Sequence, residues 1–320
     1  MKKAALIIAT ILLVAGIIIG VVALASAKFD YHMFEAAPSE LNDYPVEGDF
    51  RSIEIHGNTE IIQFAQSDDG TAHVLCRETK NKTYTVKAED GTLKITSEET
   101  TGWRNLIEIS FEKRSITVLL PKDAYETLSI ETQTGDVEVP DWLTFDGAAI
   151  RGSTSDVRFD AKVKNLLSIE TSTGDISVNG VSAEAIDCTA TTGDIRMTNI
   201  SCRGDVQAKV STGKVILEGL TCRNFVTGGS TGDASLRDVL ASGMISIERS
   251  TGDVGFTDSD AAEIWVKTST GDVTGTLLTD KVFVTKTSTG DIRVPDSVSG
   301  GKCEITTATG EISIRIVPKA

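Results

Sequence analysis

Residues 167–198 read LSIETSTGDISVNGVSAEAIDCTATTGDIRMT and contain the same pattern twice. Segments of the type Ser-Thr-Gly-Asp, each followed by an apolar-polar-apolar triplet, continue on both sides of this stretch. Their third positions are separated by 19 or 20 residues and fall at Gly135, Ser155, Gly174, Gly193, Gly213, Gly232, Gly252, Gly271, Gly290 and Gly310. A fixed period of this size is typical of a solenoid, in which each repeat stacks on the next.

Apolar and polar residues alternate inside each repeat. In the second quoted repeat, Ile195 and Met197 flank Arg196, and Ile186 stands seven residues before the glycine. A period of two indicates a strand with one buried side, whereas a helix needs a period near 3.6. The sequence therefore predicts an all-β fold: a single-stranded parallel β-helix (β-solenoid) of about ten 19–20-residue coils, with two or three strands per coil. An antiparallel sandwich is the alternative, but its turns would recur every 8–12 residues or so.

The repeats divide the chain. Residues 128–320 form the predicted STGD-repeat solenoid, and residues 46–127 keep the strand texture without the period, which predicts irregular β coils or a cap. Residues 28–45, with two prolines and several acids, are predicted to be a short stalk. The last strand, Glu311 to Val317, has no evident cap, and we expect it to be an open edge at which copies could assemble.

The N-terminus predicts a membrane anchor over residues 1–27. Lys2 and Lys3 precede an apolar run over residues 4–25, which as a helix would be about 33 Å long and would cross a bilayer core of about 30 Å. A cleaved signal peptide is the alternative, because Ala25-Ser26-Ala27 imitates a cleavage site. The lysines favour a cytoplasmic N-terminus. We therefore expect a single-pass protein of the cell membrane with its C-terminal domain extracellular.

Two columns of the repeat stand out at its corner. The threonine before the third position occurs in all ten repeats, and strand parity predicts that it lies on the inner side. An acidic residue follows the third position at Asp136, Asp156, Asp175, Asp194, Asp233, Asp253, Asp272, Asp291 and Glu311, interrupted once by Lys214. Such a ladder could collect Ca²⁺. We favour corner chemistry, in which each carboxylate accepts amide hydrogens of its own corner, because one carboxylate per coil provides few ligands.

The remaining reactive residues do not form a recognisable site. The five cysteines are not spaced as metal ligands, and we expect them in the core, with Cys202 and Cys222 close together in adjacent coils as unlinked thiols. His32, His56 and His73 all precede the repeats. The sequence holds no nucleophile elbow, phosphate loop or zinc-protease motif. We therefore predict no catalytic, cofactor-binding or metal-binding residues, no cofactor and no enzymatic activity.

The charge balance narrows the expected partners. The formal net charge of −15 opposes binding to nucleic acid. We expect a protein or polysaccharide partner of the cell envelope or surface, together with the membrane through residues 4–25. The sequence leaves the oligomeric state open.

Three features together resemble a known bacterial family. They are the N-terminal apolar span, the segments DGTLKIT (90–96) and SITVLLPKDAYETLSIETQTGDVEV (115–139), and the serial STGD coils. Over residues 46–320 the chain resembles the bacterial "putative adhesin" domain of unknown function, which includes LiaG-like proteins. The resemblance implies a surface β-helix without catalytic residues and, for LiaG-like members, an association with envelope stress. We expect a structural or interaction protein of the cell surface. The alternatives are a membrane-tethered accessory in envelope-stress sensing and a carbohydrate-active β-helix.

Overall fold

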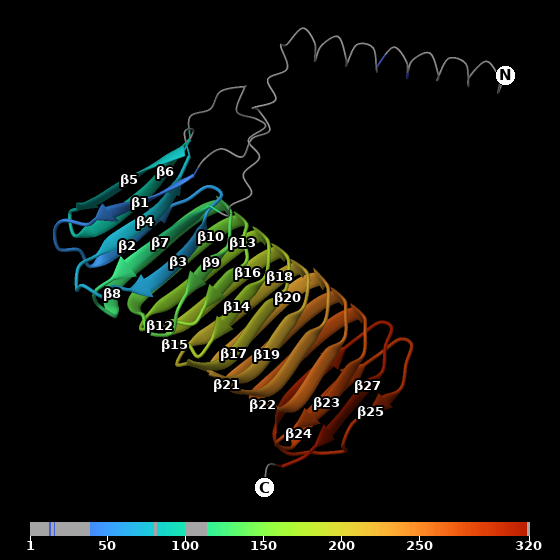
Figure 1. Cartoon of the computed structure of the whole chain (residues 1–320). Coiled ribbons are helices and arrows are strands. Elements are labelled where there is room, and N and C mark those ends of the chain that lie inside the picture. Colours follow the sequence, from blue (N-terminus) through green and yellow to red (C-terminus); the bar gives the residue numbers. More distant parts are fainter. Residues whose placement is uncertain (1–12, 14–15, 17–38, 80–81, 100–113, 319–320) are drawn as a thin grey trace.

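The chain folds into a rod of stacked β coils, with the strands of residues 39–139 at one end and those after residue 254 at the other (Figure 1). The computed structural model describes Leu13, Gly16 and residues 39–79, 82–99 and 114–318. Apart from Leu13 and Gly16, the predicted anchor at residues 4–25 lies outside the described residues. Within the described ranges, the structure contains no helix with the length and apolar character needed to span a bilayer.

The repeats stack in register, which confirms the β-solenoid of about ten turns. Thr173 pairs with Thr192 and Thr192 with Thr212 in parallel ladders between adjacent coils. A typical coil holds three strands, as in β13 (Leu166–Thr173), β14 (Ile176–Asn179) and β15 (Ser182–Ala183). The glycine corner separates the first two strands of each such coil.

The stacked strands form three faces of the rod. The first face contains, in spatial order, β5 (Lys82–Glu89), β6 (Thr92–Glu99), β2 (Ser52–His56), β8 (Ala124–Thr134), β10 (Thr144–Thr154), β13, β16 (Ala185–Thr192), β18 (Asp205–Thr212), β20 (Asn224–Thr231), the second halves of β21 (Ala234–Thr251) and β22 (Val254–Thr270), β26 (Gly301–Thr306) and β24 (Lys281–Lys286).

The second face follows the glycine corner. In spatial order it contains β1 (Glu40–Pro45), β4 (His73–Glu78), β7 (Ser115–Leu120), β3 (Ile61–Gln66), β9 (Val137–Val139), β11 (Val157–Phe159), β14, β17 (Ile195–Cys202), β19 (Val215–Cys222), the first halves of β21 and β22, β23 (Val273–Leu277), β27 (Ile312–Ile316) and β25 (Ile292–Arg293). The third face is short and contains β12 (Lys162–Val163), β15 and the chain around Cys202, Cys222, Ala241 and Ala261.

The apolar columns predicted from the alternation form one continuous core. Ile186, Ile195 and Met197 are fully buried, as are their equivalents in neighbouring coils. The third face contributes smaller side chains, Ala183, Cys202, Cys222, Ala241 and Ala261. Each coil therefore buries a few medium-sized residues, and adjacent coils share one apolar interior.

One arginine lies inside this core. Arg249 is 2% exposed, and its guanidinium donates to the Val210 carbonyl (3.3 Å) and to the Thr227 hydroxyl (3.1 Å). Burial lowers the pKa of Arg249. Gly229, in the adjacent coil, provides the space, because a Cβ there would lie 2.3 Å from the guanidinium.

The N-terminal end of the rod is capped, and its coils are not in sequence order. Strand β2 lies between β6 and β8, so the coil of residues 52–66 is enclosed by segments that follow it in the chain. Antiparallel strands complete this end, with β5 on the first face and β4 and β1 on the second. Residues 40–45, predicted to belong to the stalk, are strand β1 of this cap, while residues 28–38 lie outside the described residues.

A buried ion pair links the layers of this cap. Lys82 on β5 extends past β6 to the carboxylate of Glu60, and the two side chains are 1% and 0% exposed. Glu60 also accepts hydrogen bonds from the amides of Asn58 (2.6 Å) and Thr59 (3.0 Å) and from the Tyr84 hydroxyl (3.0 Å). The carboxylate thus has several donors in addition to its counter-ion.

The C-terminal end also departs from sequence order, which corrects the predicted serial stacking. Strand β26 pairs with β22 on one side and with β24 on the other, so the last coil of the sequence is inserted before the preceding one. The bridges from Thr309 to both Thr270 and Thr289 show the same order. The prediction that Glu311 to Val317 is the open edge is therefore wrong, because β27 is enclosed between β23 and β25. The outermost coil consists of residues 281–300.

Candidate interaction surface

The threonine column of the repeat faces solvent. Thr173, Thr192 and Thr212 are exposed, and the buried position lies two residues earlier, as at Thr171. The prediction of an inner threonine is wrong because two consecutive residues, such as Ser172 and Thr173, face outward where the chain enters the corner. Strand parity does not continue through the corner.

The corner requires glycine for a reason of space as well as conformation. Gly213 has φ of +147°, and a Cβ on it would lie 1.9 Å from the carbonyl oxygen of Gly193 in the coil below. Its amide donates to the carbonyl of Thr231 in the coil above (2.9 Å). Side chains would separate these backbones, so the column consists almost entirely of glycine.

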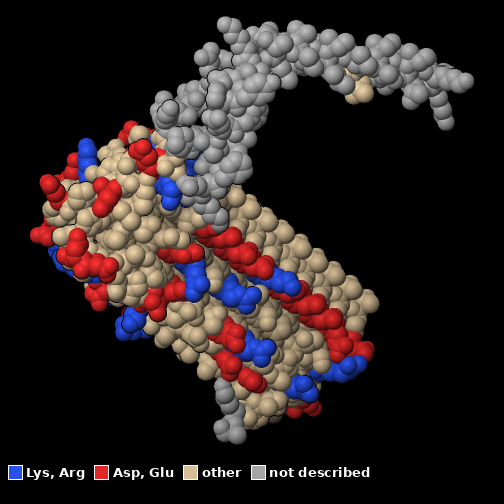
Figure 2. Space-filling model, in the orientation of Figure 1, with Lys and Arg blue, Asp and Glu red and all other residues tan. Residues whose placement is uncertain are grey.

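The acidic column connects one coil to the next. The Asp175 carboxylate accepts the amide hydrogen of Asp194 (2.7 Å), and the Asp194 carboxylate accepts that of Lys214 (2.8 Å). The amide donors thus come from the following coil and not, as expected, from the same corner. Figure 2 shows rows of acidic side chains along the rod. Across the described ranges, no three His, Cys, Asp or Glu side chains are grouped so that they could hold a metal ion.

The cysteines are buried and unlinked, as expected of core thiols. Burial is the main cause that raises the pKa of Cys76, Cys222 and Cys303 to about 12. It also raises the pKa of Cys188 and Cys202. The thiols are therefore protonated at neutral pH, and a protonated, inaccessible thiol is a poor nucleophile.

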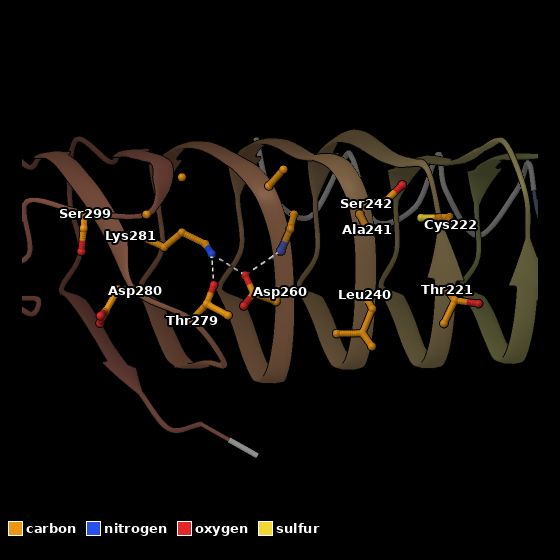
Figure 3. Close-up of a pocket in the computed structure, with 14 residues that line it drawn as sticks. Thr221, Cys222, Leu240, Ala241, Ser242, Asp260, Thr279, Asp280, Lys281 and Ser299 are labelled. Atoms are coloured by element: carbon orange, nitrogen blue, oxygen red, sulfur yellow. Dashed lines mark hydrogen bonds and ion pairs between the residues drawn. The ribbon is translucent and has the colours of Figure 1, made fainter. Parts of the chain in front are cut away.

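A groove opens on the third face near the C-terminal end of the rod. It has a volume of about 830 Å³ and runs across several coils from Thr221 to Gly301 (Figure 3). Leu240 is 41% exposed in the groove, beside the small side chains of Cys222 and Ala241. The lining of the groove therefore combines one exposed leucine with small, nearly buried apolar side chains.

An ion pair lies among the residues that line the groove (Figure 3). The Lys281 ammonium lies 2.6 Å from the Asp260 carboxylate and 2.5 Å from the Thr279 hydroxyl (Figure 3). Lys281 belongs to the outermost coil and extends past the coil of β26 to reach Asp260 on β22. Both ends of the rod therefore have a buried lysine that pairs with a carboxylate two layers away. Neither pair is predicted by the repeat pattern.

The outermost coil carries further exposed apolar side chains. Val282 and Val284 on β24, Ile292 on β25 and Val298 in the following loop are all exposed. Phe283 and Val294 point towards the interior but remain partly accessible because no further coil covers them among the described strands. The groove and the outermost coil thus both expose apolar side chains near the C-terminal end of the rod.

Most of the chain is similar to a known protein family and to solved structures. A family model described as Toastrack DUF4097 matches residues 50–209 and 203–320. No curated protein matches the chain. Among solved structures, a "putative adhesin" from Parabacteroides distasonis is 15% identical, with 85% of this chain and 98% of that chain covered and a TM-score of 0.52.

Two further solved structures are similar over most of their length. A "putative lipid binding protein" from Parabacteroides distasonis is 16% identical, with 74% and 94% of the two chains covered and a TM-score of 0.46. A "putative adhesin" from Parabacteroides merdae is 11% identical, with 87% and 96% covered and a TM-score of 0.45. The likeness to the first of the three structures, at 15% identity and a TM-score of 0.52, concerns the fold alone.

Proposed function

The chain belongs to the Toastrack DUF4097 family, and from that premise we propose that it is a non-catalytic interaction protein of the cell surface. The groove that exposes Leu240 is the observation that carries this proposal. The corner carboxylates support a non-catalytic role, because they are spread along the rod and accept backbone amides of neighbouring coils. We propose a protein or polysaccharide of the cell envelope as the partner.

The proposed location rests on the charge and length of the N-terminal segment. Residues 4–25 would hold the protein in the membrane, with the solenoid on the outer side. We expect a Ser172→Cys variant to react with a membrane-impermeant maleimide in protoplasts that express the full chain, because Ser172 is exposed and the native thiols are buried. The unmodified chain is the control for background. Labelling of S172C only after lysis would contradict the proposed location.

The groove is tested by a matched pair of leucine substitutions. Leu240 and Leu166 are 41% and 47% exposed, but only Leu240 lines the groove. We expect L240D to reduce retention of the full chain in nanodiscs on purified cell-wall fragments or immobilised envelope proteins about tenfold, the loss typical of one buried contact residue. L166D should be retained within about twofold of the unmodified protein.

Two outcomes would contradict the role of the groove. Equal retention of L240D and the unmodified chain would place the contact elsewhere. Absence of retention of the unmodified chain on every envelope fraction would remove the proposed function. Circular dichroism on both variants establishes that the coil stack is intact, since both leucines are surface residues.

A further inference from the structure

The outermost coil presents an unpaired strand edge. Strand β24 pairs only with β26, and β25 only with β27, within the described part of the chain. The carbonyl of Lys286 accepts the amide hydrogen of Thr307 (2.9 Å). In a parallel ladder alternate residues direct their amide groups to the same neighbour. The backbone N–H and C=O groups of Val282, Val284 and Lys286 are therefore directed to β26. Those of Lys281, Phe283 and Thr285 are directed away from the rod.

This end differs from the opposite one, because no strand from outside the repeat covers it among the residues that the structure describes. At the N-terminal end, antiparallel strands outside the repeat cover the last coil. At the C-terminal end, the outermost coil keeps the ordinary repeat, with Phe283 and Val294 in the inner columns. Terminal repeats of solenoids normally acquire a polar outer surface. An apolar layer beside a free strand edge is a surface suited to a further strand.

We infer that the free edge of β24 pairs with β24 of a second copy of the chain, antiparallel and about a two-fold axis. Two rods would then meet end to end at their C-terminal coils. A two-fold interface of this kind uses the same patch on both partners. The inference concerns self-association and does not depend on the partner proposed for the groove.

The charges around β24 select one register. With Phe283 opposite Phe283 of the second copy, Val282 lies opposite Val284, and Lys286 lies opposite Asp280, the exposed residue before β24. Symmetry repeats both pairs. Moving the centre to Val282 places Asp280 opposite Val284, and moving it to Val284 places Lys286 opposite Val282. Only the register centred on Phe283 pairs apolar with apolar and lysine with aspartate.

The same register defines the backbone contacts. The outward amides of Phe283 would exchange hydrogen bonds with Phe283 of the second copy, and those of Lys281 with Thr285. Val282 and Val284 would form non-hydrogen-bonded pairs, in which the Cα atoms of an antiparallel ladder lie about 4.5 Å apart. Such a separation falls within the range that a disulfide can bridge, about 4.4–6.8 Å.

Charge reversal provides the first test, on the full chain in detergent or nanodiscs. We expect light scattering to show a dimer that K286D and D280K each weaken about tenfold, because each variant places two like-charged pairs in the interface. The double variant D280K/K286D should restore the dimer, since the pairs are then reversed but complementary. If the chain associated through its N-terminal segment instead, all three variants would form the dimer as well as the unmodified protein does. That result would overturn the inference, and so would an unmodified protein that is monomeric.

Cross-linking tests the register. Under mild oxidation the double variant V282C/V284C should form a covalent dimer on a non-reducing gel, whereas V282C and V284C alone should not, because each cysteine then faces a valine. The buried native thiols keep the background low. Equal cross-linking of the single variants, or none by the double variant, would overturn the proposed register.

Discussion

The free energy of unfolding of the K82M variant is expected to be about 3–5 kcal/mol lower than that of the unmodified protein. This is the usual cost of removing one partner from a buried ion pair. Lys82 and Glu60 are 1% and 0% exposed, so water cannot replace the ammonium group. The methionine keeps the volume of the chain, but the carboxylate keeps only the hydrogen bonds from Asn58, Thr59 and Tyr84. Urea unfolding of the full chain, followed by circular dichroism, measures the change.

The same strand provides the control for this prediction. Lys87 also lies on β5 and pairs with Glu89 at 3.9 Å, but both side chains are more than half exposed. K87M should therefore change the free energy of unfolding by no more than about 0.5 kcal/mol. If K82M and K87M had the same effect, the pair between Lys82 and Glu60 would not stabilise the cap. The E60Q/K82M double variant should recover part of the loss, because it removes the uncompensated charge.

The G213A variant is expected to cost about 4 kcal/mol. Alanine at φ of +147° is strained by roughly 1–3 kcal/mol. Its Cβ would also lie 1.9 Å from the Gly193 carbonyl oxygen, and relieving such overpacking costs about 1–3 kcal/mol more. The two coils must separate at this corner to accommodate the methyl group. The fall in stability can be measured by the same urea unfolding.

A neighbouring glycine tests whether the position matters or only the residue type. A Cβ on Gly228 would have no atom within 4 Å, and this glycine is not among those with positive φ. G228A should therefore be neutral or stabilising by up to about 1 kcal/mol, through the lower entropy of the unfolded chain. A similar loss in G213A and G228A would show that the corner does not impose the glycine.

The sequence was sufficient to predict the stacking but not the order of the coils. The period of 19 or 20 residues aligned Thr173, Thr192 and Thr212 correctly, because identical repeats pair best in register. Because the repeats are so similar, their sequences do not indicate the order in which the coils stack at the C-terminal end. Strand β26 offers the same apolar columns to β22 and to β24, so periodicity cannot tell which neighbour it takes.

Individual charged residues indicate contacts between coils that the repeat period alone does not predict. Lys281 stands at the beginning of a strand yet is buried, and its charge requires a partner such as Asp260 on a more distant coil. Arg249 likewise occupies an inner position, and Gly229 is the small residue that accommodates it. A charged residue in an inner column together with a glycine nearby was the available signal. Lys281 and Asp260 line the groove, and an average repeat could not predict it.

The inserted coil also determines when the rod can be completed during synthesis. Residues 281–300 leave the ribosome before residues 301–316, yet they lie outside them in the finished stack. If residues 281–300 docked on β22 and β23 as soon as they emerged, they would occupy the place of β26 and β27 and would have to be released. We therefore expect growth by addition of successive coils to pause after residue 277, and the last two coils to assemble together once residues 301–316 are present.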